Sequence, residues 1–119
     1  MKQSLDDYFK DVYSAPLLDQ EEELALAEAI QQKGPDCEEK EQLVKCFRRF
    51  VTPVVRQYLK RGLTVEELIK AGNEGLAKAA EKYVPDADSK FITYAVWWIR
   101  QSIIQAIEEK NSLNVELKS

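Results

Sequence analysis

The apolar residues of this chain recur at intervals of three and four residues along almost its whole length. Such spacing predicts α-helices, because residues three and four apart lie on the same face of a helix. No segment shows the strict alternation of apolar and polar residues that is typical of a half-buried strand. A chain of 119 residues suits one domain. We therefore expect an all-α fold, a small bundle of about five helices.

Capping and chain-breaking residues mark the first two helices. A short amphipathic helix opens the chain and ends ahead of Pro16. Asp19 is a suitable N-cap for the second helix, because acidic residues follow it in the first turn. Gly34 and Pro35 are expected to end that helix. The apolar faces are expected to consist of Leu5, Tyr8, Phe9 and Val12 in the first helix and of Leu24, Ala27 and Ile30 in the second.

A third helix is expected from about Glu38 to Lys60. Pro53 lies inside this range and should kink the helix, because proline has no N–H to donate to the helical ladder. Gly62 is then suited to stop it. The inward positions of this helix are expected to be Leu43, Cys46, Phe47, Phe50, Val54 and Tyr58.

Thr64 and Glu67 form a capping box, which predicts the start of a fourth helix. Residues 84–89 have the composition of a loop, and a last helix is expected from about Lys90 to Lys110. Residues 111–119 are expected to fray as a tail or truncated linker, so that the helical domain covers residues 1–110. The apolar stripe of the fourth helix comprises Val65, Leu68, Ile69, Gly72, Leu76, Ala79, Ala80 and Tyr83.

The residues that carry most enzyme chemistry are missing from the sequence. Histidine is absent, and there is no glycine-rich phosphate loop and no nucleophile elbow. We interpret Cys37 and Cys46 as reduced thiols, and two cysteines alone cannot build a structural zinc site. We therefore expect a protein that is not an enzyme and that uses no metal and no cofactor.

Charge and hydropathy limit the possible partners and location. No apolar run approaches the length of about 20 residues that a membrane span needs, and the first residues lack the apolar stretch of a signal peptide. We therefore expect a cytoplasmic protein. The net charge of −4 provides no global basic surface. Any contact with nucleic acid must come from a local patch of the surface.

The adjacent residues Trp97 and Trp98 in the last helix need an explanation. Neighbours on a helix point about 100° apart, so one packed face cannot easily take both rings. Ile92, Val96, Ile99, Ile103 and Ile107 follow the spacing of a core face. A second stripe holds Tyr94, Trp97, Gln101, Ile104 and Glu108, with Trp98 and Gln105 beside it.

Rings and amides along one stripe suit nucleic acid, because aromatic faces stack on unpaired bases and amides bind base edges. Lys82, Lys90 and Arg100 are close enough in the sequence to meet phosphates. The composition alone leaves open the alternative that both tryptophans belong to the core.

Two segments carry a resemblance to a known family. ELIKAGNEGLAKAAEKY, followed by KFITYAVWWIRQSIIQAI, resembles the promoter-binding helical domain of primary-type bacterial RNA polymerase sigma factors. The second segment is especially similar to the sigma factors of Bacteroides-type bacteria. Weaker similarity extends back through PLLDQEEELALAEAI to near Ser4, so the resemblance covers almost the whole chain.

The resemblance implies two activities, both in transcription initiation. One helix would dock on the coiled coil of the largest subunit of RNA polymerase core, through Glu67, Lys70 and Asn73. The next helix would recognise and open the minus-ten element of promoter DNA. It would capture bases that flip out of the non-template strand.

The resemblance also assigns residues of the last helix to promoter DNA. Gln101 matches a residue that reads the upstream edge of the minus-ten element. Trp97 and Trp98 match the pair that props the junction between duplex and melted DNA, and Tyr94 matches the ring that replaces a departed adenine. The other implied DNA positions, which support the site or contact phosphates, are Lys90, Phe91, Thr93, Arg100 and Gln105, the last of which is arginine in many members.

The sequence of this chain departs from the family's pattern at several positions. The family has an aromatic residue, preceded by basic residues, where this chain has Ala87-Asp88-Ser89. It has Gln-Glu where this chain has Lys70-Ala71. Phe47-Arg48 replaces the usual Asn-Leu. We expect either a fragment of a longer factor or a divergent stand-alone protein.

Two other functions remain open at this point. The first is a stand-alone, sigma-like regulator that engages a protein partner and has lost promoter melting. Ser89 and Lys70 favour it, whereas the intact stripe from Tyr94 to Gln101 favours promoter binding. The second is an enzyme, which the missing catalytic groups make the weakest of the three hypotheses.

Overall fold

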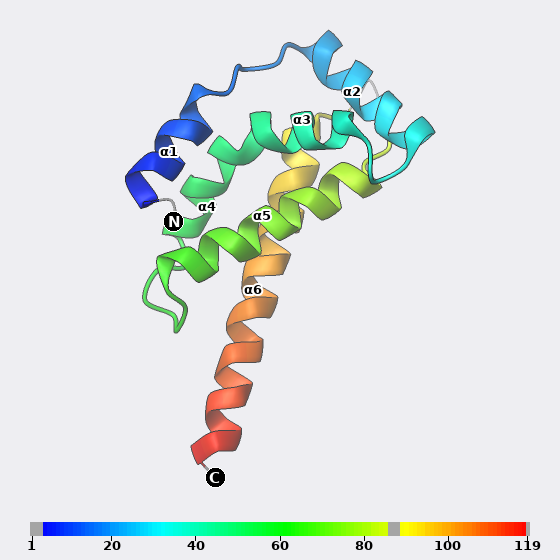
Figure 1. Ribbon diagram of the computed structural model, residues 1–119. Helices are drawn as coiled ribbons and strands as arrows, with labels where there is room; N and C mark the ends of the chain where they lie inside the picture. Colours follow the sequence, from blue (N-terminus) through cyan, green and yellow to red (C-terminus); the bar gives the residue numbers. More distant parts are fainter. Residues whose placement is uncertain (1–3, 86–88, 119) are drawn as a thin grey trace.

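Every regular element that the computed structural model describes is a helix, which confirms the expected all-α class (Figure 1). The structure describes residues 4–85 and 89–118, and the side chains as far as residue 113. The elements, in chain order, are α1 (Leu5–Ser14), α2 (Gln20–Lys33), α3 (Glu38–Phe47), the 3₁₀ turn η1 (Arg48–Phe50), α4 (Val51–Arg56), α5 (Val65–Lys82) and α6 (Phe91–Lys118).

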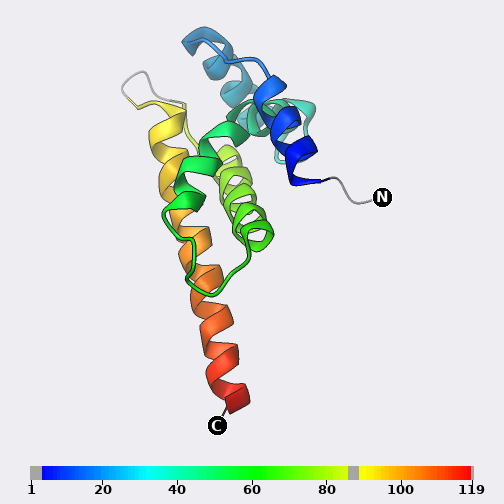
Figure 2. The same ribbon diagram turned by 90° about the vertical axis from the view of Figure 1, so that its left-hand side faces the viewer.

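The helices α5 and α6 cross at the centre of the molecule, and the other helices lie to one side of this pair (Figures 1 and 2). Two glycines of α5 allow close packing, Gly75 against α6 and Gly72 mainly against α4. A Cβ placed on Gly75 would lie only 2.5 Å from the carbonyl oxygen of Trp98. A Cβ on Gly72 would lie 2.6 Å from Cγ1 of Val51. The part of α6 around Trp98 and Ile99 is therefore held directly against the α5 backbone.

The expected helix caps are present. Asp19 Oδ1 accepts a hydrogen bond of 2.8 Å from the backbone N–H of Glu22, and Thr64 forms the same kind of capping box with Glu67. Gly34 ends α2 with a φ of 92°, a conformation that favours glycine. These local signals place the starts of α2 and α5 correctly, because each cap satisfies N–H groups that a helix start leaves without partners.

The expected single helix from Glu38 to Lys60 is wrong. It is divided into α3, η1 and α4, and α4 already ends at Arg56. Pro53 explains the position of the break, because its ring would clash with the carbonyl of residue 49 in a continuous helix. The chain changes to a 3₁₀ turn over residues 48–50, and Pro53 then lies in the first turn of α4, where its missing N–H costs little. Beyond α4, Lys60 and Gly62 both have positive φ, so Gly62 belongs to a turn rather than to a helix end.

The last helix is longer than expected. It runs to Lys118 instead of ending near Lys110. Residues 91–118 contain neither glycine nor proline, so nothing in the sequence stops the helix at residue 110. The C-terminal part of α6 extends beyond the other helices (Figures 1 and 2). The domain boundary at residue 110 stays a prediction.

The core face of α6 also differs from the expected one at its beginning. Ile92 and Val96 are only partly buried, whereas Phe91 and Ala95 are fully buried. The buried line is Phe91, Ala95, Ile99, Ile103 and Ile107. Three residues that were expected on apolar faces are exposed instead, and each lies near the start of its helix: Leu5, Leu24 and Val65. Within the described part of the chain, no helix is long and apolar enough to cross a membrane.

Candidate nucleic-acid interface

The two adjacent tryptophans of α6 have different surroundings. Trp97 is 55% exposed, whereas Trp98 is partly buried and packs against the hydrophobic core. Their ring centroids are 5.2 Å apart and the rings are almost perpendicular, with an interplanar angle of 86°. The Trp98 ring therefore supports the Trp97 ring, which presents most of its surface to solvent.

A chain of aromatic contacts fixes Trp98. Its ring centroid lies 6.4 Å from that of Tyr94, and Tyr94 lies 5.6 Å from Tyr83 at the end of α5. Tyr83 in turn contacts Phe91 at 5.3 Å. Phe91 is 0% exposed, so its side chain cannot contact DNA directly. The resemblance implies either a supporting role or a phosphate contact for this position, and only the supporting role is compatible with burial.

Tyr83 also fixes the start of α6 in a second way. Its hydroxyl group donates a hydrogen bond of 2.6 Å to the carbonyl oxygen of Ser89. Its own carbonyl accepts one of 3.4 Å from Nε2 of Gln31 on α2. Ser89 and Lys90 are exposed. Ala87 and Asp88, which the sequence analysis singled out, lie outside the described residues.

The polar side chains of the stripe lie on the exposed face of α6. Thr93, Trp97, Gln101 and Gln105 follow one another at intervals of four residues, and all four are exposed. Gln105 donates a hydrogen bond of 3.1 Å from Nε2 to Glu109. The structure thus brings four of the nine predicted DNA-binding residues onto one continuous exposed face.

Cationic groups border this face. Lys90 is exposed at the start of α6, and Arg100 is partly buried on the helix itself. The Nζ atom of Lys82, on α5, lies 5.9 Å from the centroid of the Trp98 ring, which is a cation–π distance. Lys82 therefore both stabilises the ring and places a positive charge beside the exposed aromatic surface.

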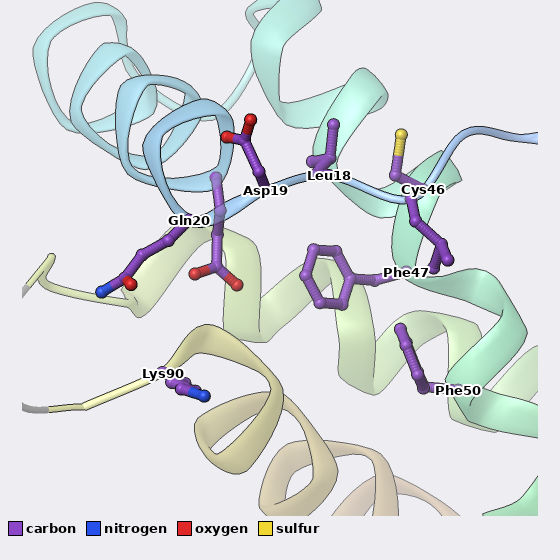
Figure 3. Close-up of a pocket in the computed structure, with 9 residues that line it drawn as sticks. Leu18, Asp19, Gln20, Cys46, Phe47, Phe50 and Lys90 are labelled. Atoms are coloured by element: carbon purple, nitrogen blue, oxygen red, sulfur yellow. The ribbon is translucent and has the colours of Figure 1, made fainter.

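A hollow of about 210 Å³ opens between the start of α2, the end of α3 and the start of α6 (Figure 3). Phe47 and Phe50 form its apolar side, and Lys90 lies at its other side. Glu23 also lines it, and burial raises the pKa of its carboxyl group, an effect that the charge of Lys90 opposes. Phe47 therefore places an aromatic ring where the resemblance implies the amide side chain of an asparagine.

The three residues predicted to dock on polymerase lie on α5 and have different partners. Glu67 accepts a hydrogen bond from the Thr64 backbone, which lowers the pKa of its carboxyl group, and its Oε2 lies 3.5 Å from Nζ of Lys110. Asn73 donates a hydrogen bond of 2.9 Å from Nδ2 to the hydroxyl of Tyr8 on α1. Lys70 is exposed. Glu67 and Asn73 therefore also have structural roles.

Two residues that position the site were not recognised from the sequence. Tyr83 was assigned only to an apolar stripe, although it connects α2, the loop and α6. Gly75 was not singled out at all, although it lets the Trp98 backbone approach α5. The one available signal was the pair of glycines three residues apart in α5, which indicates a close helix contact.

Comparisons with known proteins show which family the sequence is similar to. Residues 4–35 match Sigma-70 factor, region 1.2, and residues 43–112 match Sigma-70 region 2. The chain is 41% identical over 103 residues to the RNA polymerase sigma factor SigA of Clostridium acetobutylicum and to that of Listeria monocytogenes. It is 39% identical over 100 residues to the RNA polymerase sigma factor RpoS of Coxiella burnetii.

These alignments cover 84–87% of this chain but only 27–28% of the relatives. The chain therefore spans about a quarter of the length of the curated relatives that it matches. The match to region 2 includes both α5, which holds the predicted docking residues, and the aromatic face of α6, since both lie inside residues 43–112. The chain belongs to the sigma-70 family and contains its regions 1.2 and 2.

Proposed function

We propose that this chain binds RNA polymerase core in the cytoplasm, and that it recognises and opens the minus-ten element of promoter DNA without covalent chemistry. In this proposal α6 captures bases of the non-template strand, and α5 docks on the coiled coil of the largest polymerase subunit. The observation that carries the proposal is the exposed ring of Trp97. Buried and half-buried aromatic rings support it, and exposed amide side chains lie next to it on the same helix face.

The energetics of base capture fit this surface. Opening a duplex costs a few kcal/mol for each base that leaves the stack. Stacking an unpaired base on an aromatic side chain returns about 1–3 kcal/mol. Trp97 can accept a base without rearrangement of the core, because more than half of its surface is already exposed. Trp98 and Tyr94 keep its ring in place.

The charges near the face support contact with the DNA backbone. The chain as a whole carries a net charge of −4, so attraction to DNA must be local. Lys82, Lys90 and Arg100 supply positive charge at the edge of the aromatic face. Their phosphate contacts would position the strand, while Gln101 and Gln105 would read base edges.

Tryptophan fluorescence tests this proposal. A single-stranded oligonucleotide with the non-template minus-ten sequence should quench the emission of Trp97 at low salt, because a stacked base covers its ring. Trp97→Ala should weaken binding of a labelled oligonucleotide by about 1–3 kcal/mol. Tyr13→Ala, which removes another exposed ring on α1, is the matched control and should bind as the wild type does. Equal affinities of the two variants would contradict the proposal.

A second candidate function is a protein-interaction regulator that has lost promoter melting. Lys70 supports it, because this cation is exposed on the helix where the resemblance places an uncharged amide. The same oligonucleotide separates the two functions. A chain that binds polymerase core but shows no quenching at high DNA concentration would be such a regulator.

A further inference from the structure

The hydroxyl group of Tyr83 connects the end of α5 to the residue that precedes Lys90. Tyr83 is 5% exposed, and its ring packs against Phe91, with 5.3 Å between centroids, and against Tyr94, with 5.6 Å between centroids. The hydroxyl donates a hydrogen bond of 2.6 Å to the carbonyl oxygen of Ser89, six residues further along the chain. This bond is partly buried, which strengthens it relative to a bond in water. It holds the Ser89 carbonyl close to the end of α5.

The backbone of Tyr83 is itself fixed at both of its polar groups. Its N–H donates a hydrogen bond of 2.9 Å to the carbonyl of Ala79 on α5. Its carbonyl accepts one of 3.4 Å from Nε2 of Gln31 on α2. The hydroxyl therefore extends from a fixed position, and the bond that it makes fixes Ser89 relative to both α2 and α5.

Lys90 is the charged residue whose position depends on this bond, because its backbone follows the Ser89 carbonyl directly. Residues 83–89 contain no lysine or arginine, so Lys90 is the first cation after Lys82 in the sequence. Lys90 also lines the same hollow as Glu23, whose carboxylate attracts its ammonium group. A DNA phosphate must compete with Glu23 for this cation. The direction in which the Lys90 side chain leaves the backbone therefore affects which anion it meets.

We propose that the Tyr83 hydroxyl is a positioning group for DNA binding, which holds the Ser89 carbonyl so that Lys90 is directed toward a phosphate of the non-template strand. The inference rests on the proposed function and deepens it, because it assigns the placement of one phosphate contact to a buried residue. The physical reason is preorganisation. A lysine whose backbone is already held near its bound position loses less conformational freedom when it binds.

Tyr83→Phe tests the proposal, because it removes the hydroxyl and keeps the ring that packs against Phe91 and Tyr94. Ser89 is exposed, so water can replace the lost partner of its carbonyl and the fold should persist. Binding of a labelled minus-ten oligonucleotide should weaken by about three- to tenfold at low salt. The dependence of binding on salt should also become less steep, by up to the share of one phosphate contact, about 0.7 in the logarithmic slope.

A double-mutant cycle with Lys90→Gln identifies the route of this effect. If the hydroxyl acts through Lys90, Tyr83→Phe should change the affinity by less than about twofold in a chain that already carries Lys90→Gln. Tyr8→Phe is the matched control, because it also removes a hydrogen-bonded tyrosine hydroxyl, 2.9 Å from Nδ2 of Asn73, but on α1. It should leave both the affinity and the salt dependence as they are in the wild type.

The outcomes distinguish this inference from the proposed function. A wild-type chain that does not bind the oligonucleotide would overturn both. A wild-type chain that binds, with a Tyr83→Phe variant of equal affinity and equal salt dependence, would overturn the inference alone. A loss of affinity that is the same with and without Lys90 would do so too, because the hydroxyl would then act through another part of the face. Circular dichroism compares the folds, and an unfolded Tyr83→Phe variant would also contradict the inference, since the hydroxyl would then be needed for the fold itself.

Discussion

Gly75 links the packing of two helices to the position of Trp98, a predicted DNA-binding residue. It lies on α5 where α6 crosses, directly under the backbone of Trp98. Because a larger residue there would push against main-chain atoms, the space cannot be recovered by a change of rotamer. The ring of Trp98 supports the exposed ring of Trp97, so the proposed DNA interface depends on the buried residue Gly75.

We expect Gly75→Ala to lower the free energy of unfolding by about 1–3 kcal/mol, as overpacking of a core does. The added Cβ would lie 2.5 Å from the Trp98 carbonyl oxygen and 2.9 Å from Cα of Ile99, so one helix must shift. Urea unfolding measures the loss. Lys78→Ala, an exposed substitution on the same helix, should stay within about 0.5 kcal/mol of the wild type. A Gly75→Ala variant that is as stable as Lys78→Ala would show that the helices are not in close contact.

The helices themselves differ in how far the sequence predicts them. The starts of α2 and α5 follow from Asp19 and Thr64, because capping is a local property of a few residues. The division of the third helix does not follow from periodicity, since apolar spacing continues through the break at residues 48–50. The only partial burial of Val96 on α6 was also missed, because the crossing with α5 decides which apolar residues are fully buried.

The break after α3 has a consequence for α1. It brings Arg48 and Arg49 to the surface on which α1 rests, and both arginines bind α1 or the residue after it. The hydrogen bond from Arg48 is the main reason that the pKa of Asp11 lies below its ordinary value. A lowered carboxyl pKa stabilises the fold above the ordinary value of 3.8, and this stabilisation disappears as the pH falls through the folded-state pKa.

Asp11→Asn should therefore lower the melting temperature at neutral pH and have a progressively smaller effect as the solution is acidified below pH 3.8. Thermal unfolding followed by circular dichroism at several pH values measures this convergence. Asp36→Asn, in the exposed turn before α3, is the control and should have no comparable effect at neutral pH. A difference between Asp11→Asn and the wild type that is constant from neutral to acidic pH would exclude the charge of Asp11 as its cause.

In the molecule as a whole, α5 and α6 carry the two proposed binding surfaces, and their crossing forms the centre of the core. The sequence indicated that Trp97 and Gln101 share one stripe of α6, because residues four apart lie on the same face of a helix. That this stripe binds DNA stays a prediction. It could not predict which tryptophan is exposed, since this depends on Tyr94 and Lys82, which pack against Trp98 from two helices.

The negative net charge of the chain would make the proposed DNA binding dependent on a few cations. A ligand strand meets an overall charge of −4, so only the cations next to the aromatic face can release counterions from its phosphates. Each phosphate contact with a single strand contributes about −0.7 to the slope of a plot of the logarithm of the binding constant against the logarithm of the salt concentration.

We therefore expect Lys90→Gln to make this slope about 0.7 less steep, because Lys90 is exposed at the start of the face. Titrations of a labelled minus-ten oligonucleotide at several salt concentrations give the slope. Lys10→Gln changes the net charge equally but lies on α1, and its slope should equal that of the wild type. If both variants changed the slope by the same amount, the strand would sense only the total charge, and the local cation surface proposed for α6 would be wrong.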